Sequence, residues 1–330
     1  MDPRYEYIAR PAGAFQENVT GPTAVRLCHR AFGSDTVVDA VTELPWGTYN
    51  NAYRVDLRGR PPVVLRVAPA PHRQFAVEKA MLRNEYAAAP YLAPVGALLP
   101  RTLFADFTHQ LIGRDYVIQS VLPGVPAPEG MGRYSRPEWS GLFRQIGAVA
   151  RALHEVRGPG FGPVAGPRFE SWSEAIRRYF LTAASDVERS GNDSDDVRAL
   201  AARADRFSAV LDEIAEPRLL HGDGWTANFL VDPRTPELML TGVCDWDRAE
   251  WGDPFADWAI QRALLRPGTE RDAFWVGYES SREAVSGIRQ QFYRARHVLG
   301  FRLDRIRSGE DLTDTYEEIA AILRQLDRAP

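Results

Sequence analysis

Three oxygen-bearing side chains in the second half of the chain have the types and spacing that phosphoryl transfer requires. Asp223 follows a histidine and a glycine, Asn228 comes five residues later, and Asp245 comes seventeen residues after that. Phosphoryl transfer needs a carboxylate that orients the attacking hydroxyl and ligands that hold Mg²⁺. Mg²⁺ prefers oxygen donors and usually takes one or two of them from the protein. The spacing therefore predicts Asp223 as the catalytic base and Asn228 and Asp245 as Mg²⁺ ligands.

Each of these residues alone has a simpler structural explanation. An aspartate beside glycine usually forms a turn, and an isolated Asn228 would be a turn or cap residue. Asp245 is harder to explain in this way, because it lies between Val243 and Trp246 in an apolar run. An ionised carboxylate there is costly unless it is paired or bound to a metal. The joint spacing, and not any single residue, favours the chemical interpretation.

Other classes of enzyme fit the sequence less well. A metallohydrolase would use His221, Asp223 and Asp245 as ligands, but it would be expected to need more histidines than the six scattered along this chain. A serine hydrolase is disfavoured because the chain has no Gly-x-Ser-x-Gly segment.

The elements that must position these residues fall into two groups. Period-two alternation and β-branched residues indicate five strands, at 37–38, 52–57, 63–67, 101–106 and 115–122. Helices are expected among them at 20–33, between Thr20 and Gly33 as caps, and at about 74–92. Beyond a linker-like stretch at 122–128, we expect helices at about 137–156, 171–190 and 195–214, a β-like patch at 218–245, and further helices to the C-terminus.

The predicted fold class is therefore α+β, with two lobes. A small antiparallel-β N-terminal lobe, residues 1–119, would bind the nucleotide. A larger and mainly helical C-terminal lobe, residues 120–330, would carry the catalytic and acceptor-binding groups. Ligands are expected in the cleft between the two lobes.

The candidate residues belong to a longer pattern, in which His221-Gly-Asp-x-x-x-x-Asn228 is followed by Asp245-Trp and then by Gly-Asp253-Pro-x-x-Asp257. This pattern resembles the aminoglycoside phosphotransferase and choline kinase superfamily, whose members share the protein-kinase fold. The resemblance implies the same roles for Asp223, Asn228 and Asp245 that their spacing suggests. It also implies that His221 supports the loop, that Asp257 accepts backbone N–H bonds from it, and that Asp253 caps the next helix.

The N-terminal half extends the resemblance. The segment 46–51 is similar to the family's nucleotide-covering loop, which implies nucleotide contacts for Gly47, Thr48 and Asn50. Taken alone, with one glycine, it fits a plain hairpin turn better. Arg66 stands where the family has a phosphate-contacting lysine, and Lys79 is the only lysine in the chain. Arginine keeps the charge but presents a planar fork. Some small-molecule kinases of the superfamily also carry arginine at this position.

Two further nucleotide contacts follow from the same resemblance. A glutamate on the next helix should pair with Arg66, and Glu85 fits better than the alternative, Glu78. The segment around Gln119 and Val121 resembles the hinge, where backbone groups would hold the base. The sequence leaves ATP and GTP open as phosphate donors, with Mg²⁺ as the metal.

The acceptor is predicted only as a small molecule with a hydroxyl group. An antibiotic is the first expectation; a sugar, a choline-like amine or homoserine is the alternative, and a catalytically silent fold is a third. Glu279 and Glu283 could face a cation, but Arg282 and Arg289 are as near in sequence. A group of aromatic residues could line an apolar pocket, although at helical spacing such residues are more often core: Phe274, Trp275, Tyr278, Phe292, Tyr293 and Phe301.

Composition limits the partners. The 330 residues include 40 basic and 44 acidic side chains, for a net charge of −4, so the chain lacks the basic footprint of a nucleic-acid binder. It has no apolar run long enough for a membrane span and no signal-like N-terminus. With two cysteines, a disulfide framework is not expected. We expect a cytoplasmic monomer or homodimer that binds a nucleoside triphosphate and a small acceptor, without nucleic acid or membrane.

Overall fold

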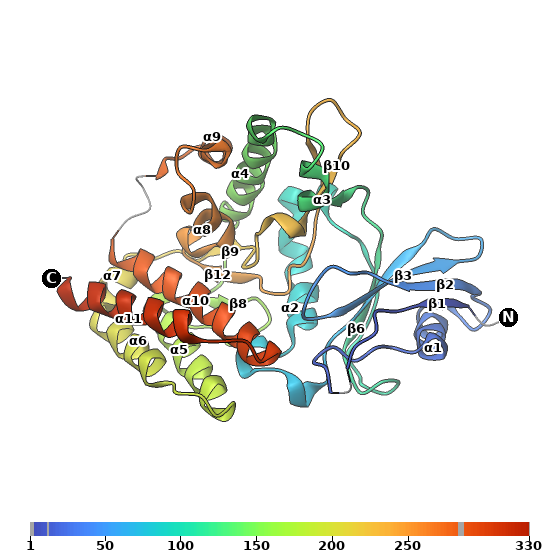
Figure 1. The fold of residues 1–330 in the computed structure, drawn as a ribbon, viewed down its shortest axis with the longest axis horizontal. Coiled ribbons are helices and arrows are strands. Elements are labelled where there is room, and N and C mark those ends of the chain that lie inside the picture. The colour runs from blue at the N-terminus through green and yellow to red at the C-terminus, as the bar shows by residue number, and fades with distance from the viewer. Residues whose placement is uncertain (1–2, 12, 283–286, 330) are drawn as a thin grey trace.

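The structure is a computed structural model that describes residues 3–11, 13–282 and 287–329 (Figure 1). Glu283, one of the two glutamates considered as cation contacts, lies outside these ranges. Within them, no helix is both long and apolar enough to cross a membrane.

A six-stranded sheet forms most of the first part of the chain, at the right of Figure 1, in the order β1-β2-β3-β4-β6-β5. Its strands are β1 (Arg4–Glu6), β2 (Val38–Glu43), β3 (Asn51–Leu57), β4 (Val63–Val67), β5 (Thr102–Asp106) and β6 (Tyr116–Ser120). Only the β1–β2 pair is parallel; the other four pairs are antiparallel. Strands occur at all five expected places, although β2 starts at Val38 and extends well beyond the expected 37–38. β1 is an addition that the sequence analysis did not predict.

One helix, α1 (Gly21–Phe32), covers a face of this sheet. The Thr20 hydroxyl accepts a hydrogen bond from the Thr23 amide, and the helix ends at Gly33, which has a positive φ of 100°. Leu27 and Cys28 of α1 pack with buried residues of the strands, among them Tyr53 and Val55. The predicted helix at 20–33 and its caps are therefore confirmed.

The helix expected at about 74–92 is shorter than predicted. Only α2 (Met81–Ala88) is α-helical, between the 3₁₀ segments Ala76–Glu78 and Ala89–Leu98. Before α2, the Asp186 carboxylate accepts hydrogen bonds from the amides of Ala76 and Val77, at 2.8 and 3.1 Å, which fixes this segment outside a regular helix. After α2, two prolines lack the amide donors that an α-helix would need.

The rest of the chain is mainly helical. Its helices are α3 (Ala127–Met131), α4 (Ser140–His154), α5 (Trp172–Arg189), α6 (Asp195–Arg206), α7 (Ser208–Leu211), α8 (Trp258–Leu264), α9 (Ala273–Tyr278), α10 (Ile288–Ser308) and α11 (Thr313–Arg328). The helices predicted at 137–156 and 171–190 correspond to α4 and α5, and the one predicted at 195–214 is divided into α6 and α7.

Two small three-stranded sheets carry the functional loops of this helical part. One has the order β11-β10-β7 and the other β8-β12-β9. Their strands are β7 (Val125–Pro126), β8 (Gly162–Pro163), β9 (Arg218–Leu220), β10 (Phe229–Asp232), β11 (Met239–Val243) and β12 (Glu250–Gly252). The stretch 122–128 is therefore not a free linker, because β7 pairs with β10 and α3 begins directly after it.

Two hydrophobic cores hold the helices together. One joins α4, α8 and α9, and the other joins α5, α6, α10 and α11. Most of the aromatic residues considered for a pocket belong to these cores: Phe274, Trp275, Phe292 and Tyr293 are buried. Phe301 differs, with 49% of its surface exposed. The architecture confirms the α+β fold with a small, mainly antiparallel sheet lobe and a larger helical lobe.

Candidate active site

The loop that carries Asp223 leaves β9 and returns through the 3₁₀ segment Thr226–Asn228 into β10. Gly222 has a φ of 76°, and a Cβ there would lie 2.0 Å from the carbonyl oxygen of Arg248, so the loop requires glycine at this point. Asn228 Nδ2 donates to the backbone oxygen of Asp223 at 2.8 Å and to its Oδ2 at 3.2 Å. Both hydrogen bonds are donated by the side-chain amide nitrogen of Asn228, so the side-chain oxygen Oδ1 is left to bind a metal ion.

Asp245 reaches the same place from β11. Phe229 of β10 pairs with Val243 of β11, and the Cys244 amide donates to the Asn228 backbone oxygen at 3.0 Å. This pairing brings Asn228 and Asp245 to neighbouring strand ends. Asp245 has a φ of 66°, unusual for a residue other than glycine. Such backbone conformations are found preferentially at functional sites.

Arg66 connects this site with the sheet lobe through two ion pairs. From β4, its guanidinium pairs with Glu85 of α2 and with Asp245, which lies 179 residues away in sequence. Gln119 Nε2 donates to the other oxygen of Glu85 at 2.7 Å. The structure thus brings together Arg66, Glu85, Gln119 and Asp245, as the sequence analysis expected for the first two.

The alternative partner, Glu78, has a different position. It lies 3.1 Å from Arg248 and pairs with Arg307 of α10. Glu85 and not Glu78 is therefore the partner of Arg66. Neither Arg248 nor Arg307 was singled out from the sequence, because no local pattern marks them.

Asp257 fixes the start of the catalytic loop. Its Oδ2 accepts the His221 amide at 2.8 Å and lies 3.0 Å from His154 Nε2. Burial by itself would raise the pKa of Asp257, but its hydrogen bonds with the His154 ring and the His221 amide hold that pKa below its usual value. Burial lowers the pKa of His221, whose neutral ring packs on Trp246 at 4.2 Å between centroids. The structural roles expected for His221 and Asp257 are confirmed.

The environment of Asp223 suits a group that takes up a proton. Burial raises the pKa of its carboxyl to about 6; Arg248 opposes this increase and the Asp245 carboxylate adds to it. A base with a pKa near neutrality is ionised at physiological pH and still accepts a proton readily.

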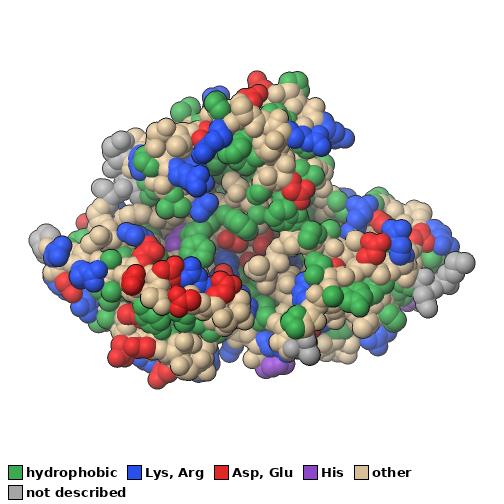
Figure 2. All heavy atoms as spheres, viewed as in Figure 1, with side chains coloured by type: hydrophobic (Ala, Val, Ile, Leu, Met, Phe, Trp, Pro, Cys, Tyr) green, Lys and Arg blue, Asp and Glu red, His purple; other side chains and the backbone are tan. Residues whose placement is uncertain are grey.

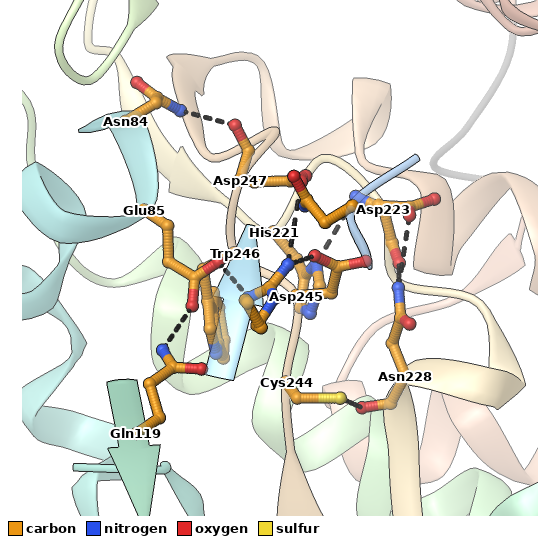
Figure 3. A network of polar contacts seen from close by, with 12 residues as sticks. Asn84, Glu85, Gln119, His221, Asp223, Asn228, Cys244, Asp245, Trp246 and Asp247 are labelled. Carbon is orange, nitrogen blue, oxygen red and sulfur yellow. Dashed lines mark hydrogen bonds and ion pairs between the residues drawn. The ribbon is translucent and has the colours of Figure 1, made fainter. Parts of the chain in front are cut away.

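Asp247 is a further site residue that the sequence analysis missed. It is 4% exposed, its Oδ2 accepts from Asn50 Nδ2 at 3.1 Å, and it lies 3.8 Å from Arg66. Burial and then the charge of Asp245 raise the pKa of Asp247 well above its usual value. In the sequence, its place as the second aspartate of Asp245-Trp-Asp247 could have marked it as a site residue. Figure 3 shows Asn84 from α2, whose Nδ2 donates at 3.0 Å to the Asp247 backbone oxygen.

The loop between β2 and β3 carries the other expected nucleotide contacts. Gly47, with a φ of 99°, and Thr48 are exposed, whereas Asn50 is buried against Asp247. Gln16 Nε2 donates to the backbone oxygen of Asn50 at 2.9 Å. Trp46 Nε1 donates to Glu129 Oε1 of α3 at 2.6 Å, so the loop also contacts the helical lobe.

The expected hinge lies at the end of β6. The Gln119 side chain is directed at Glu85, so only its backbone remains for a base. Val121 is half-buried and lies directly beyond the strand.

The candidate ligand oxygens of this site fit Mg²⁺ better than a metal ion whose ligands all come from the protein. Across the described ranges, no three His, Cys, Asp or Glu side chains are grouped as a metal site. Asn228 and Asp245 offer one amide and one carboxylate oxygen at neighbouring strand ends. Mg²⁺ commonly takes one or two protein groups and completes its shell with phosphate oxygens and water.

Comparison with known proteins shows the family to which the chain belongs. A family model described as the phosphotransferase enzyme family matches residues 40–289, and the chain belongs to that family. It is accordingly a small-molecule phosphotransferase with the kinase-like fold. A comparison with curated protein sequences finds no match.

Solved structures share the fold at low sequence identity. One is a putative aminoglycoside phosphotransferase from Ralstonia eutropha, with TM-score 0.59, 17% identity, and 93% of this chain and 97% of that chain covered. Another is the GDP and kanamycin complex of APH(2″)-IIIa, with TM-score 0.59, 18% identity and coverage of 92% and 98%. A third is a putative fructosamine-3-kinase from Thermobifida fusca, with TM-score 0.55, 18% identity and coverage of 90% and 98%.

Proposed function

We propose that this protein transfers the γ-phosphoryl group of a nucleoside triphosphate to a hydroxyl of a small molecule, in a reaction that depends on Mg²⁺. The observation that carries this proposal is the meeting of Asp223, Asn228 and Asp245 with the Arg66–Glu85 pair in one site. A catalytically silent fold would not need to retain all of these groups. The nucleotide is further supported by the similar structure that was solved with GDP.

The residues divide the chemistry between them. Asp223 orients the acceptor hydroxyl and accepts its proton late in the transfer, as the oxygen–phosphorus bond forms and the nucleoside diphosphate leaves. Asn228 and Asp245 would hold Mg²⁺, which supplies positive charge to the phosphate oxygens when it is bound. Arg66 places a permanent positive charge beside the same site. Transfer is direct, without a phosphoenzyme.

The lobes divide the substrates. Residues 1–119 would bind the nucleotide, through Gly47, Thr48 and the hinge backbone at Gln119 and Val121. Residues 120–330 would supply the catalytic loop and the acceptor site. An antibiotic is the first candidate acceptor, because a similar fold was solved with kanamycin. A metabolic acceptor is the second candidate, because another similar structure is a putative fructosamine-3-kinase.

The reaction can be tested with a panel of acceptors. The protein is incubated with Mg²⁺, ATP or GTP and an aminoglycoside, a macrolide, a nucleoside antibiotic, choline, homoserine or a fructosamine. Mass spectrometry then detects the compound that gains one phosphate. Omission of Mg²⁺ should abolish the product. Absence of both nucleotide binding and product would contradict the proposed function.

Asp223→Asn tests the catalytic assignment. The variant keeps the shape of the side chain and removes the proton acceptor, so kcat should fall by about 10²–10⁴-fold with little change in nucleotide affinity. The control is Asp232→Asn, which changes an aspartate paired with Arg234 at the surface and should leave kcat unchanged. Wild-type kcat in Asp223→Asn would show that the assignment is wrong.

A further inference from the structure

Three aromatic side chains lie on the catalytic loop, on α8 and on α10. We define the aromatic strip as Trp225, Trp258 and Phe301. Trp225, two residues beyond Asp223, is 42% exposed, and Phe301 of α10 is 49% exposed. Trp258, the first residue of α8, packs edge-on against Phe301 at 5.5 Å between ring centroids. Two of its three members therefore present large apolar surfaces to solvent.

The strip borders the catalytic carboxylate. A Cβ on Gly224 would lie 3.0 Å from the Ala259 Cβ, so the loop between Asp223 and Trp225 packs directly on the first turn of α8. On α10, Asp304 follows Phe301 by three residues and lies on the same face. Asp304 is near enough to Asp223 for its charge to act on that carboxyl. An acceptor hydroxyl within hydrogen-bonding reach of Asp223 would thus bring the rest of its molecule against the strip.

The ring that stacks on Trp258 from behind is uncharged. The His297 ring stacks on Trp258 at 4.1 Å, with the two planes 12° apart. Burial lowers the pKa of His297 well below its usual value, and the Arg296 charge lowers it further, so the ring is neutral at physiological pH. A stacked, neutral backing of this kind favours a flat apolar face in the ligand.

An arginine rim borders the strip at α8; we define it as Arg262, Arg266 and Arg271. The Arg262 guanidinium lies 6.0 Å from the centre of the Trp258 ring, and Arg271 Nη1 donates to the Arg262 backbone oxygen at 2.9 Å. In the part of the chain that the structure describes, none of the three forms an ion pair. Figure 2 shows basic side chains over α8 and α9, and below them a central hollow that is bordered by hydrophobic side chains and contains acidic ones.

Three acidic groups near the strip are paired with arginines. Asp304 lies 2.7 Å from Arg307, and Glu78 pairs with both Arg248 and Arg307. Glu270, next to Arg271 in sequence, is 3.0 Å from Arg136. In the described part of α8 and the segment that follows it, the guanidinium groups of the arginine rim are therefore positive charges without an ion pair.

We propose that the acceptor is a hydroxylated ring compound that carries an anionic group, either a carboxylate or a phosphate. Its ring stacks on the aromatic strip, its anionic group meets the arginine rim, and its hydroxyl lies at Asp223. This inference rests on the proposed function, because Asp223 marks where the hydroxyl binds. Among the acceptors considered under the proposed function, this inference disfavours a polycation such as kanamycin, because its amines would lie against guanidinium groups and be repelled.

Matched fragments test this charge preference without knowledge of the natural acceptor. The probes are 4-(hydroxymethyl)benzoate, 4-(hydroxymethyl)phenylphosphonate and 4-(hydroxymethyl)benzylamine, which share a ring and a hydroxymethyl group. Their Kd values are measured by ligand-observed NMR on the protein loaded with Mg²⁺ and a non-hydrolysable ATP analogue. At least one anionic fragment should bind more tightly than the amine, and the better of the two distinguishes carboxylate from phosphate recognition.

Substitutions in the arginine rim and the aromatic strip test where the fragments bind. Arg262→Gln and the exposed Arg266→Gln should each raise the Kd of the anionic fragment about fivefold without weakening the amine. Phe301→Ala should weaken all fragments alike, because it removes stacking and no charge. The control, Arg294→Gln, removes a guanidinium that pairs with Glu318 on the α11 side of α10 and should change nothing.

The outcomes distinguish a failure of the proposed function from a failure of the anionic-acceptor proposal. Failure of the nucleotide analogue to bind contradicts the proposed function itself. With the nucleotide bound, tighter binding of the amine, no binding of any fragment at its solubility limit, or wild-type affinity in both arginine variants would overturn the anionic acceptor alone. Arg266→Gln changes an exposed side chain and keeps the test valid if Arg262→Gln does not fold.

Discussion

The charges around Asp223 act on its pKa in opposite directions. Burial and the Asp245 carboxylate raise the pKa, whereas the Arg248 guanidinium lowers it. Arg248 is held in place by Glu78 at 3.1 Å, a residue of the sheet lobe. The proton affinity of the candidate base therefore depends on a contact between the two lobes as well as on its own loop.

The pH dependence of the reaction should follow this balance. With an acceptor from the panel, kcat/KM should rise about tenfold per pH unit below pH 6 and level off above it, because Asp223 with a pKa of about 6 must be ionised to act. Arg248→Gln removes the charge that lowers this pKa, so the midpoint of the profile should move to higher pH.

Arg178→Gln is the matched control for this measurement, since Arg178 is an exposed residue of α5. Its profile should coincide with that of the wild type. A midpoint that moves to lower pH in Arg248→Gln would show that Arg248 does not act on Asp223 as described.

Among the elements, Asp257 joins three that are separated in sequence. It ends the segment before α8, accepts the His221 amide after β9, and contacts His154 at the end of α4. Because its pKa is lower in the folded chain than usual, the ionised group stabilises the fold above the unfolded-state pKa. This stabilisation is lost as the pH falls through the lower, folded-state pKa.

Asp257→Asn should therefore lower the free energy of unfolding by about 2–4 kcal/mol at neutral pH, because a buried acceptor is replaced by a donor. The difference from the wild type should shrink in acid. Urea unfolding at several pH values measures both effects. The control, Asp205→Asn, removes an exposed pair with Arg177 and should cost less than about 1 kcal/mol. Equal effects of the two substitutions would show that Asp257 does not hold these three elements together.

The boundaries of the helices and strands show which of them can be predicted from the local sequence. The cap residues Thr20 and Gly33 define α1, and alternation defines β3 and β4, because the physics is local in each case. The segment 74–80 is different. The Asp186 carboxylate, 110 residues away, accepts a hydrogen bond from the Ala76 amide of this segment. No residue within the segment predicts that contact. Helical periodicity alone therefore predicted a longer helix than α2.

On the scale of the whole molecule, Arg307 connects the last part of the chain with the first. From α10 it pairs with Glu78, 229 residues away, and its guanidinium lies 4.2 Å from the centre of the Phe15 ring and 5.3 Å from that of Tyr49. Tyr49 belongs to the loop proposed to cover the nucleotide. The helix that borders the proposed acceptor site therefore also contacts the nucleotide side.

Arg307→Met should weaken nucleotide binding about threefold to tenfold, because the loop loses a cation–π contact and Glu78 loses one of its two partners. Calorimetric titration with a non-hydrolysable nucleotide measures this Kd. Arg305→Met, which removes an exposed pair with Asp314 on the same helix, is the control and should bind as the wild type does. Unchanged affinity in Arg307→Met would show that this contact does not support the loop.

The candidate site was predictable to the extent that a spaced motif marks it. Asp223, Asn228 and Asp245 stand out in the sequence because phosphoryl transfer dictates their types and spacing. The roles of Arg248 and Arg307 were not predictable, since each depends on Glu78, a residue that the fold brings to them from the other lobe. Trp258 and Phe301 likewise meet only once α8 and α10 are packed.

The arginine at position 66 also determines which reagents can modify the site. Acyl-phosphate derivatives of nucleotides acylate lysine amines beside bound phosphates, and here the only lysine, Lys79, is exposed on a groove lined by Pro71, Phe75 and Arg189. Arg66 instead presents a guanidinium, which does not react with acyl phosphates but condenses with dicarbonyl compounds such as phenylglyoxal. Activity-based surveys that label kinases through lysine should therefore overlook this protein, whereas arginine-directed labelling with nucleotide protection should find it.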